Sequence, residues 1–192
     1  MTPSGTSIVL SALILVSAMT SGCRPARRPD PAPLVRSDSN VEVESPPPVH
    51  QFPKPNGFVN DFAAIVTATE EENLESVLRR LRERGKIDFA IVIVKSTGSR
   101  DIFDYSLAMA NEWKVSSENG GILLLVSIED RKWGIQIDKK LEKKFTNEEI
   151  KRLGDLMVPH FREQNYNAGL RVCVKAIADE LARRHDFEPV NF

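Results

Sequence analysis

The hydrophobic pattern becomes regular after residue 58, and it begins with a helix followed by a strand. Thr69, with Glu72 three residues later, has the spacing of a helix-capping box, and Gly85 marks the expected end of the helix. The apolar positions between them recur at helical spacing and are Leu74, Val77, Leu78 and Leu81. The next apolar run, residues 87–94, is rich in β-branched residues, which is typical of a strand buried on both faces.

A second helix and a hairpin are predicted for the middle of the chain. The helix covers residues 101–113, and its apolar side is formed by Ile102, Tyr105, Met109 and Trp113. Residues 121–128 ("GILLLVSI") form a second buried strand, and the charged residues 129–132 ("EDRK") form a turn. Residues 133–138 alternate between apolar side chains and polar or small ones, as a half-solvated antiparallel strand does. The two strands therefore predict a β-hairpin.

The C-terminal part of the chain is predicted to be helical. Thr146 and Glu149 form another capping box, and Pro159 is expected to end or kink the helix that follows. The apolar positions of this helix are Ile150, Leu153 and Met157, and those of the last helix are Leu170, Cys173, Val174, Ile177 and Leu181. Because helices alternate with fully apolar strands, the chain is predicted to form a three-layer α/β/α sandwich around a mixed central sheet.

The first 23 residues have the pattern of a bacterial secretion signal. The apolar run from Ile8 to Met19 is too short to span a bilayer, but it suits the central part of a signal peptide. Ser21, Gly22 and Cys23 resemble a lipoprotein box, in which the cysteine is lipidated and becomes the new N-terminus. An uncleaved anchor or plain secretion is the alternative. The domain is therefore expected on the periplasmic side of a bacterial cell envelope, lipid-anchored through Cys23, with the membrane as its partner.

Proline content separates a linker from the folded domain. Residues 24–55 contain most of the 12 prolines and cannot bury enough apolar surface to fold, so they are predicted to be a disordered spacer. The domain is expected to span residues 56–186, and residues 187–192 form a short tail. Cys173 is expected to pack as a small apolar residue on the last helix.

Charge and motif content exclude several functions. The chain has 26 basic and 27 acidic residues, so no overall field attracts nucleic acid. It has no phosphate loop, no dinucleotide-binding glycine motif, no G-x-S-x-G elbow and no paired-histidine metal motif. Its three histidines are His50, His160 and His185. They lie far apart in the sequence and are expected at the surface instead of in a metal site.

Carboxylates and amides at the ends of the predicted elements are the remaining chemical groups. They are Asp61, Glu118, Asn119, Glu129, Asp130 and Glu142. Oxygen ligands from several loops are what a hard cation such as Ca²⁺ or Mg²⁺ requires. The same residues also suit a structural role, with Asp61 as a cap on local backbone and the others as solvated turn residues. Their spacing leaves both interpretations open.

Four blocks between about Pro53 and Leu181 resemble the TPM domain family. They are "GFVNDFAAIV", "NEWKVSSENGGILLLVSIEDRKWGIQI", "LEKKFTNEEI" and "VPHFREQNYNAGL". The family occurs in bacterial envelope proteins and in a thylakoid lumen acid phosphatase. The resemblance implies an α/β/α sandwich, a divalent cation in some members, and acid-phosphatase-like phosphomonoesterase activity in some members.

The resemblance also implies a site. A pocket for Ca²⁺ or Mg²⁺ would be formed by Asp61, Asn119, Glu129 and Asp130, with Glu118 as the alternative to Asn119. Arg131 would lie beside this pocket as a phosphate partner, because a guanidinium offers a fork of donors. In the implied mechanism the metal polarises a phosphoryl oxygen and activates a water, and a carboxylate acts as base. The catalytic residues would be Asp61, Asp130 and Arg131.

Three departures from the family pattern bear on activity. Asp138 and Lys140 replace the two glycines of a Gly-x-Gly-Leu-Glu segment, and with Lys139 they predict a reshaped, more positive loop at the ligand site. Asn119 and Asn147 stand where the family commonly has Asp. Two functions are therefore expected: a weak or vestigial divalent-metal-dependent phosphatase, or a non-catalytic interaction or scaffold module that supports other envelope membrane proteins.

Overall fold

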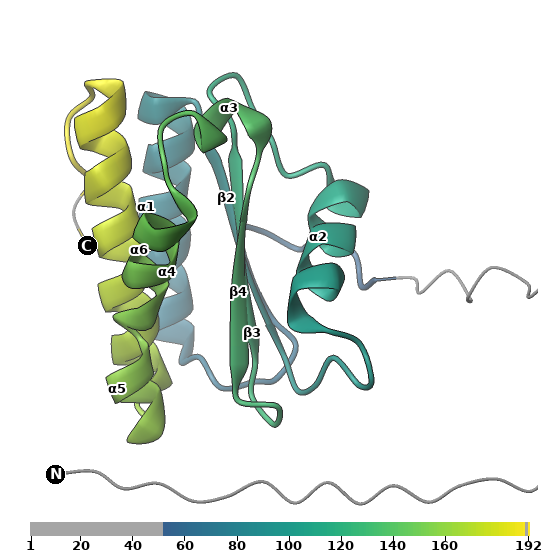
Figure 1. The fold of residues 1–192 in the computed structure, drawn as a ribbon. Helices are drawn as coiled ribbons and strands as arrows, with labels where there is room; N and C mark the ends of the chain where they lie inside the picture. Colours follow the sequence, from purple (N-terminus) through teal and green to yellow (C-terminus); the bar gives the residue numbers. More distant parts are fainter. Residues whose placement is uncertain (1–51, 191) are drawn as a thin grey trace, which may run out of the picture. The chain divides into compact units, whose positions relative to one another are not determined.

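The computed structural model describes residues 52–190 and 192, so the predictions for the signal segment, Cys23 and residues 24–51 lie outside the described residues. The centre of the described region is a four-stranded sheet in the order β1-β2-β3-β4 (Figure 1). Its strands are β1 (Val59–Asp61), β2 (Asp88–Val94), β3 (Gly121–Ser127) and β4 (Lys132–Ile137). The helices are α1 (Ala68–Gly85), α2 (Ile102–Trp113), α3 (Lys139–Glu142), α4 (Asn147–Asp155), α5 (Val158–Arg162) and α6 (Tyr166–His185). β1, β2 and β3 are parallel and β4 is antiparallel to β3, which confirms the predicted mixed sheet with a hairpin.

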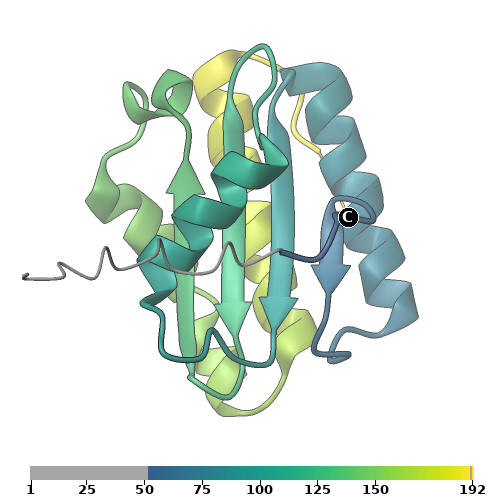
Figure 2. The ribbon, with the colours of Figure 1, turned by 90° about the vertical axis from the view of Figure 1, so that its right-hand side faces the viewer.

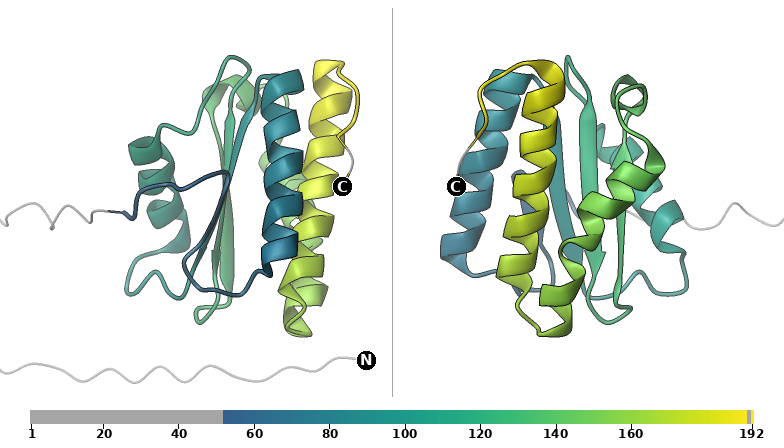
Figure 3. Two further views of the ribbon diagram at one scale, coloured as in Figure 1. Left: turned by 180° about the vertical axis from the view of Figure 1, so that it is seen from behind. Right: turned by 60° about the vertical axis from the view of Figure 1, so that its left-hand side comes forward.

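Helices cover both faces of the sheet. α2 covers one face, and α1, α4, α5 and α6 cover the other (Figure 1, Figure 3). Alternate residues of a strand point to opposite faces. Ile91 of β2 and Leu124 of β3 therefore join a large core with α1 and α6, whereas Val92 and Leu125 join a smaller core under Met109 of α2. The predicted three-layer α/β/α sandwich is confirmed.

The first helix begins two residues earlier than its predicted capping box. Thr67 is the N-cap, and its hydroxyl accepts a hydrogen bond from the Glu70 backbone N–H at 3.3 Å. Thr69 lies inside the helix, so the predicted box was wrong. Thr67 and Glu70 have the same Thr-x-x-Glu spacing as Thr69 and Glu72. The carboxylate of Glu70 is buried and pairs with the guanidinium of Arg171 on α6.

Three short elements, β1, α3 and α5, were not predicted, because three to five residues are too few to show a periodic pattern. The capping box of α4 is confirmed: Thr146 accepts from the Glu149 N–H, and the Glu149 carboxylate accepts from the Thr146 N–H. Pro159 lies in the first turn of α5, where its missing N–H removes no helical hydrogen bond.

The last helix, α6, packs lengthwise beside α1 (Figure 3). Cys173 is fully buried on its inner side, as predicted, and burial raises the pKa of the thiol to about 12. The thiol therefore stays protonated and unreactive at neutral pH. Within the described residues, no helix is both long and apolar enough to cross a membrane.

Candidate functional site

The carboxyl ends of the three parallel strands meet at one edge of the sheet, and open α/β sheets bind ligands at this edge. β1 ends there at Asp61, β2 leads into Ser96 and Thr97, and β3 leads into the turn Glu129–Arg131. We call these residues the carboxyl edge. The fold thus joins three polar segments that are far apart in the sequence.

Asp130 links the hairpin turn to the loop after β2 through hydrogen bonds. Its carboxylate accepts hydrogen bonds from the Ser127 hydroxyl at 2.6 Å and from the Thr97 backbone N–H at 2.8 Å. The hydroxyls of Ser96 and Thr97 donate to it at 2.9 and 3.2 Å. These donors, the Ser127 hydroxyl foremost, lower the pKa of Asp130 to about 2. Asp130 is therefore ionised at neutral pH, and its oxygens already bind protein donors.

Asp61 organises the loop between β1 and α1. One of its carboxylate oxygens accepts from the Ala63 N–H at 3.0 Å, and the other accepts from the Ile65 and Val66 N–H groups at 2.7 Å. These bonds hold a tight turn in which Ala64 has a left-handed φ of 56°. The predicted role of Asp61 as a cap on local backbone is confirmed.

Glu129 and Asn119 lie at opposite edges of the sheet. Glu129 is exposed on the hairpin turn, and its carboxylate has no hydrogen-bond partner among the described residues. Asn119 precedes β3 together with Glu118, and its side-chain amide donates to the Gly85 carbonyl at 2.8 Å. The seven residues of β3 separate the two edges by roughly 20 Å. Of the predicted site residues, the structure brings together Asp61, Glu129, Asp130 and Arg131.

The four predicted metal ligands do not form one coordination site in this conformation. Asp61 and Asp130 follow β1 and β3, with β2 between them, so their backbones are ~10 Å apart. Asn119 lies at the other edge. Within residues 52–190, no three His, Cys, Asp or Glu side chains are grouped so that they could hold one metal ion. The set as a whole does not fit a cation, and metal binding by this chain stays a prediction.

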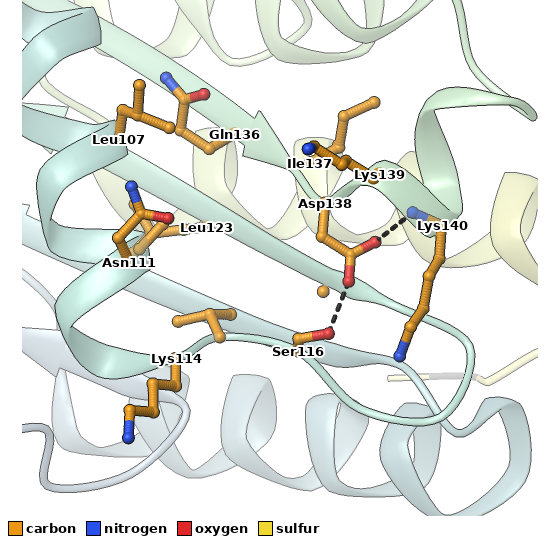
Figure 4. Close-up of a pocket in the computed structure, with 13 residues that line it drawn as sticks. Leu107, Asn111, Lys114, Ser116, Leu123, Gln136, Ile137, Asp138, Lys139 and Lys140 are labelled. Carbon is orange, nitrogen blue, oxygen red and sulfur yellow. Dashed lines mark hydrogen bonds between the residues drawn. The ribbon is translucent and has the colours of Figure 1, made fainter.

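The residues that replace the family glycines lie at the amino edge of the sheet, away from the carboxyl edge. Asp138 caps α3: one carboxylate oxygen accepts from the Lys140 N–H at 2.9 Å, and the other accepts from the Ser116 hydroxyl at 2.6 Å (Figure 4). Asp138, Lys139 and Lys140 line a pocket of about 350 Å³ beside the C-terminal half of α2. The expected reshaping does not reach the carboxyl edge, because antiparallel β4 returns the chain before Asp138.

A cationic pocket lies beside the hairpin at the carboxyl edge. It has a volume of about 550 Å³ and is bounded by the β3–β4 turn, α5 and the start of α6. Its charged side chains are Arg131, Lys132 and Arg162, and no Asp or Glu of the described chain lines it. Its aromatic side chains are Trp133, Phe161 and Tyr166. Guanidinium groups around an aromatic wall suit a phosphate group that carries an organic substituent.

Sequence reasoning identified Arg131 but assigned no role to Arg162. Arg162 reaches the pocket because α5 is held close to α6: Phe161 packs edge-on against Tyr166 at 5.2 Å and covers Gly169. A Cβ at Gly169 would lie 2.6 Å from the Phe161 ring, so this close approach requires glycine. The block "VPHFREQNYNAGL" contained the signal, since it combines a cation with these aromatic residues.

Comparisons with known proteins agree with this fold. A family model described as the TPM domain matches residues 59–180. The solution NMR structure of the N-terminal domain of a protein from P. gingivalis is 28% identical, has a TM-score of 0.63, and the match covers 70% of this chain and 88% of that chain. The NMR structure of the BA42 protein from Bizionia argentinensis is 19% identical with a TM-score of 0.57, and the match covers 68% of this chain and 89% of that chain. The N-terminal domain of the cg2496 protein from Corynebacterium glutamicum is 10% identical with a TM-score of 0.54, and the match covers 70% of this chain and 84% of that chain. The last two show similarity of fold alone, and a comparison with curated proteins finds no match.

The fold and its carboxyl edge define the class as a three-layer α/β/α domain with a mixed sheet. Because the family model matches well over half of the chain, the chain belongs to the TPM domain family. The resemblance seen in the four sequence blocks is confirmed.

Proposed function

We propose that this chain is a membrane-tethered, extracytoplasmic TPM domain that binds phosphate-bearing ligands in the cationic pocket. The observation that carries the proposal is that Arg131, Lys132 and Arg162 line one cavity, and that no Asp or Glu among residues 52–190 lines it with them. Each guanidinium can donate two parallel hydrogen bonds to a phosphate, and the aromatic walls can contact the organic part of an ester. A lipid on Cys23 would hold the domain at the periplasmic face of the envelope, where phosphate-bearing membrane components are its partners.

The carboxyl edge favours binding over turnover. A general base works best when its pKa lies near the working pH, and the pKa of Asp130 is about 2. The hydrogen bonds that lower this pKa come from three residues of the scaffold, so the carboxylate of Asp130 already has a structural role in the turn. Asp61 is likewise engaged with its own loop. A rigid turn that presents Arg131 is suited to recognition.

Phosphomonoester hydrolysis is the second candidate function. It is favoured by the position of Asp61 and Glu129 at the same edge as the cationic pocket. Hydrolysis of p-nitrophenyl phosphate, with and without added Ca²⁺ or Mg²⁺, tests it, and a bound metal should also raise the melting temperature. Turnover that Asp61→Asn abolishes would replace the binding proposal with an enzymatic one.

Arg131→Gln and Arg162→Gln should each weaken binding of p-nitrophenyl phosphate about tenfold or more, because each removes a charge-assisted hydrogen bond worth ~1.5–3 kcal/mol. Isothermal titration calorimetry on the full-length protein in detergent measures the affinity. Arg79→Gln, an exposed substitution on α1, is the matched control and should leave the affinity unchanged. Equal affinities of all four proteins would refute the proposed pocket.

Cys23→Ser should release the protein from the membrane, because the proposed lipid anchor depends on the thiol of this residue. Fractionation of the cells that produce the protein, followed by detection in soluble and membrane fractions, measures the change. Cys173→Ala is the control and should stay in the membrane fraction. A Cys23→Ser protein that remains bound would contradict the lipid anchor.

A further inference from the structure

The last strand of the sheet has no partner on its outer side. β4 pairs with β3 only, and the Asp138 N–H donates to the Gly121 carbonyl at 2.9 Å. In an antiparallel ladder, alternate residues direct their N–H and C=O groups toward and away from the paired strand. Trp133, Ile135 and Ile137 therefore direct theirs outward. No backbone or side-chain group of the described residues hydrogen-bonds to them.

A groove of about 680 Å³ follows this outer edge. Ile135 and Ile137 lie along it, Phe103 of α2 forms one wall, and the segment from Glu142 to Ile150 forms the other. Phe103 is 57% exposed, although it is a large apolar side chain. Figure 2 shows the strand at the margin of the sheet, with α2 in front of it. The outward groups span about 13 Å, which matches an added strand of about five residues.

The groove is acidic as well as apolar. The charged side chains that line it are Glu142 and Glu148, both exposed, and no Lys, Arg or His of the described chain lines it. Phe145 and Ile150 on the same wall supply apolar surface. Side chains of an added strand alternate between two faces, so one face would meet Phe103 and the other would meet the glutamates. The groove therefore complements a strand whose apolar and basic residues alternate.

We infer that the outer edge of β4 binds an extended peptide of a partner protein in which apolar residues alternate with Lys or Arg. The peptide adds a strand to the sheet. Hydrogen bonds to Trp133, Ile135 and Ile137 supply affinity, and attraction to Glu142 and Glu148 selects the basic sequence. The groove shares no lining residue with the cationic pocket, and Trp133, whose side chain lines that pocket, would contribute only its backbone to the peptide site. Arg131 and Arg162 do not line the groove, so this inference can be tested separately from phosphate binding.

A short synthetic peptide of alternating valine and lysine tests the inference on the full-length protein. We expect binding by fluorescence anisotropy and slower amide hydrogen exchange at Trp133, Ile135 and Ile137. The same peptide with every backbone amide N-methylated has no N–H to donate to the strand through either of its edges, so it should not bind. A peptide of alternating valine and glutamate should not bind either, because it meets two like charges.

Two variants identify the surface. Glu142→Gln combined with Glu148→Gln should weaken peptide binding about tenfold and reduce its salt dependence, whereas Glu83→Gln on α1 should have no effect. Ile135→Pro removes the central outward N–H at a position where edge strands tolerate proline, and it should abolish binding. Equal binding of the N-methylated or glutamate peptide would overturn the inference. So would a dimer of this chain that forms through β4 and excludes the peptide.

Discussion

Asp130→Asn should lower the stability of the protein at neutral pH, and its difference from the wild type should shrink as the pH falls from about 4 through about 2. The hydrogen bonds from Ser127, Thr97 and Ser96 lower the pKa of Asp130 from 3.8 to about 2 in the folded state. A depressed carboxyl pKa contributes stability above the unfolded-state value, and this contribution is lost as the pH falls through the folded-state value. Asparagine has the same shape, but it carries no charge and turns an N–H₂ toward these donors.

Urea unfolding of both proteins from neutral pH down to about pH 2 measures this effect. Glu149 and Glu180 also have pKa values of about 2, but they are the same in both proteins, so the difference isolates Asp130. Glu129 is the neighbouring exposed carboxylate, and Glu129→Gln is the matched control. It makes the same change in charge and should leave the stability nearly unchanged. A difference that stays constant over this pH range, or an equal loss in Glu129→Gln, would refute the hydrogen-bonded link between the hairpin and the loop after β2.

Gly121→Ala should lower the free energy of unfolding by about 3 kcal/mol or more, which is a large part of the 5–15 kcal/mol typical of domains. A Cβ at this position would lie 2.0 Å from the carbonyl oxygen of Val115 and 2.9 Å from the Cα of Ser116. Both neighbours are backbone atoms, so either β3 or the α2–β3 loop must move. Because β3 lies between β2 and β4, its displacement disturbs both ladders.

Gly134→Ala on β4 is the matched control for this substitution. The nearest atom to its added Cβ would be the Ser106 hydroxyl oxygen at 3.4 Å, an ordinary contact, so we expect a change of about 1 kcal/mol or less. Chemical denaturation of both variants measures the free energies. Similar losses in the two proteins would show that close backbone approach at Gly121 is not the cause.

The main elements of the fold were predictable because their patterns are local. β2 and β3 are continuous apolar runs, and α6 has one apolar stripe, so each is visible in a short window of sequence. The capping box at Thr146 was predictable for the same reason. The start of α1 was predicted two residues too late, because Thr67 with Glu70 and Thr69 with Glu72 have the same spacing in the sequence.

The candidate site was predictable only in part. The family resemblance selected Asp61, Glu129, Asp130 and Arg131, and the parallel strands bring these residues to one edge. It also selected Asn119, which the same strands place at the opposite edge. The cationic pocket depends on α5, which is too short to leave a periodic pattern.

By itself, the sequence determined the layer architecture and the order of the main elements, because apolar periodicity decides which faces of a helix or strand are buried, and the resemblance of its four blocks indicated the family. Only the tertiary structure decided what the polar residues do. Ser96, Thr97 and Ser127 had no distinguishing sequence pattern. Their hydrogen bonds to Asp130 nevertheless make this turn carboxylate the link between two loops. Arg162 and Arg131 likewise line one pocket although they are 31 positions apart in the sequence. Hydrogen bonds and charges act across short distances in space, and the direction of the strands determines which segments come that close.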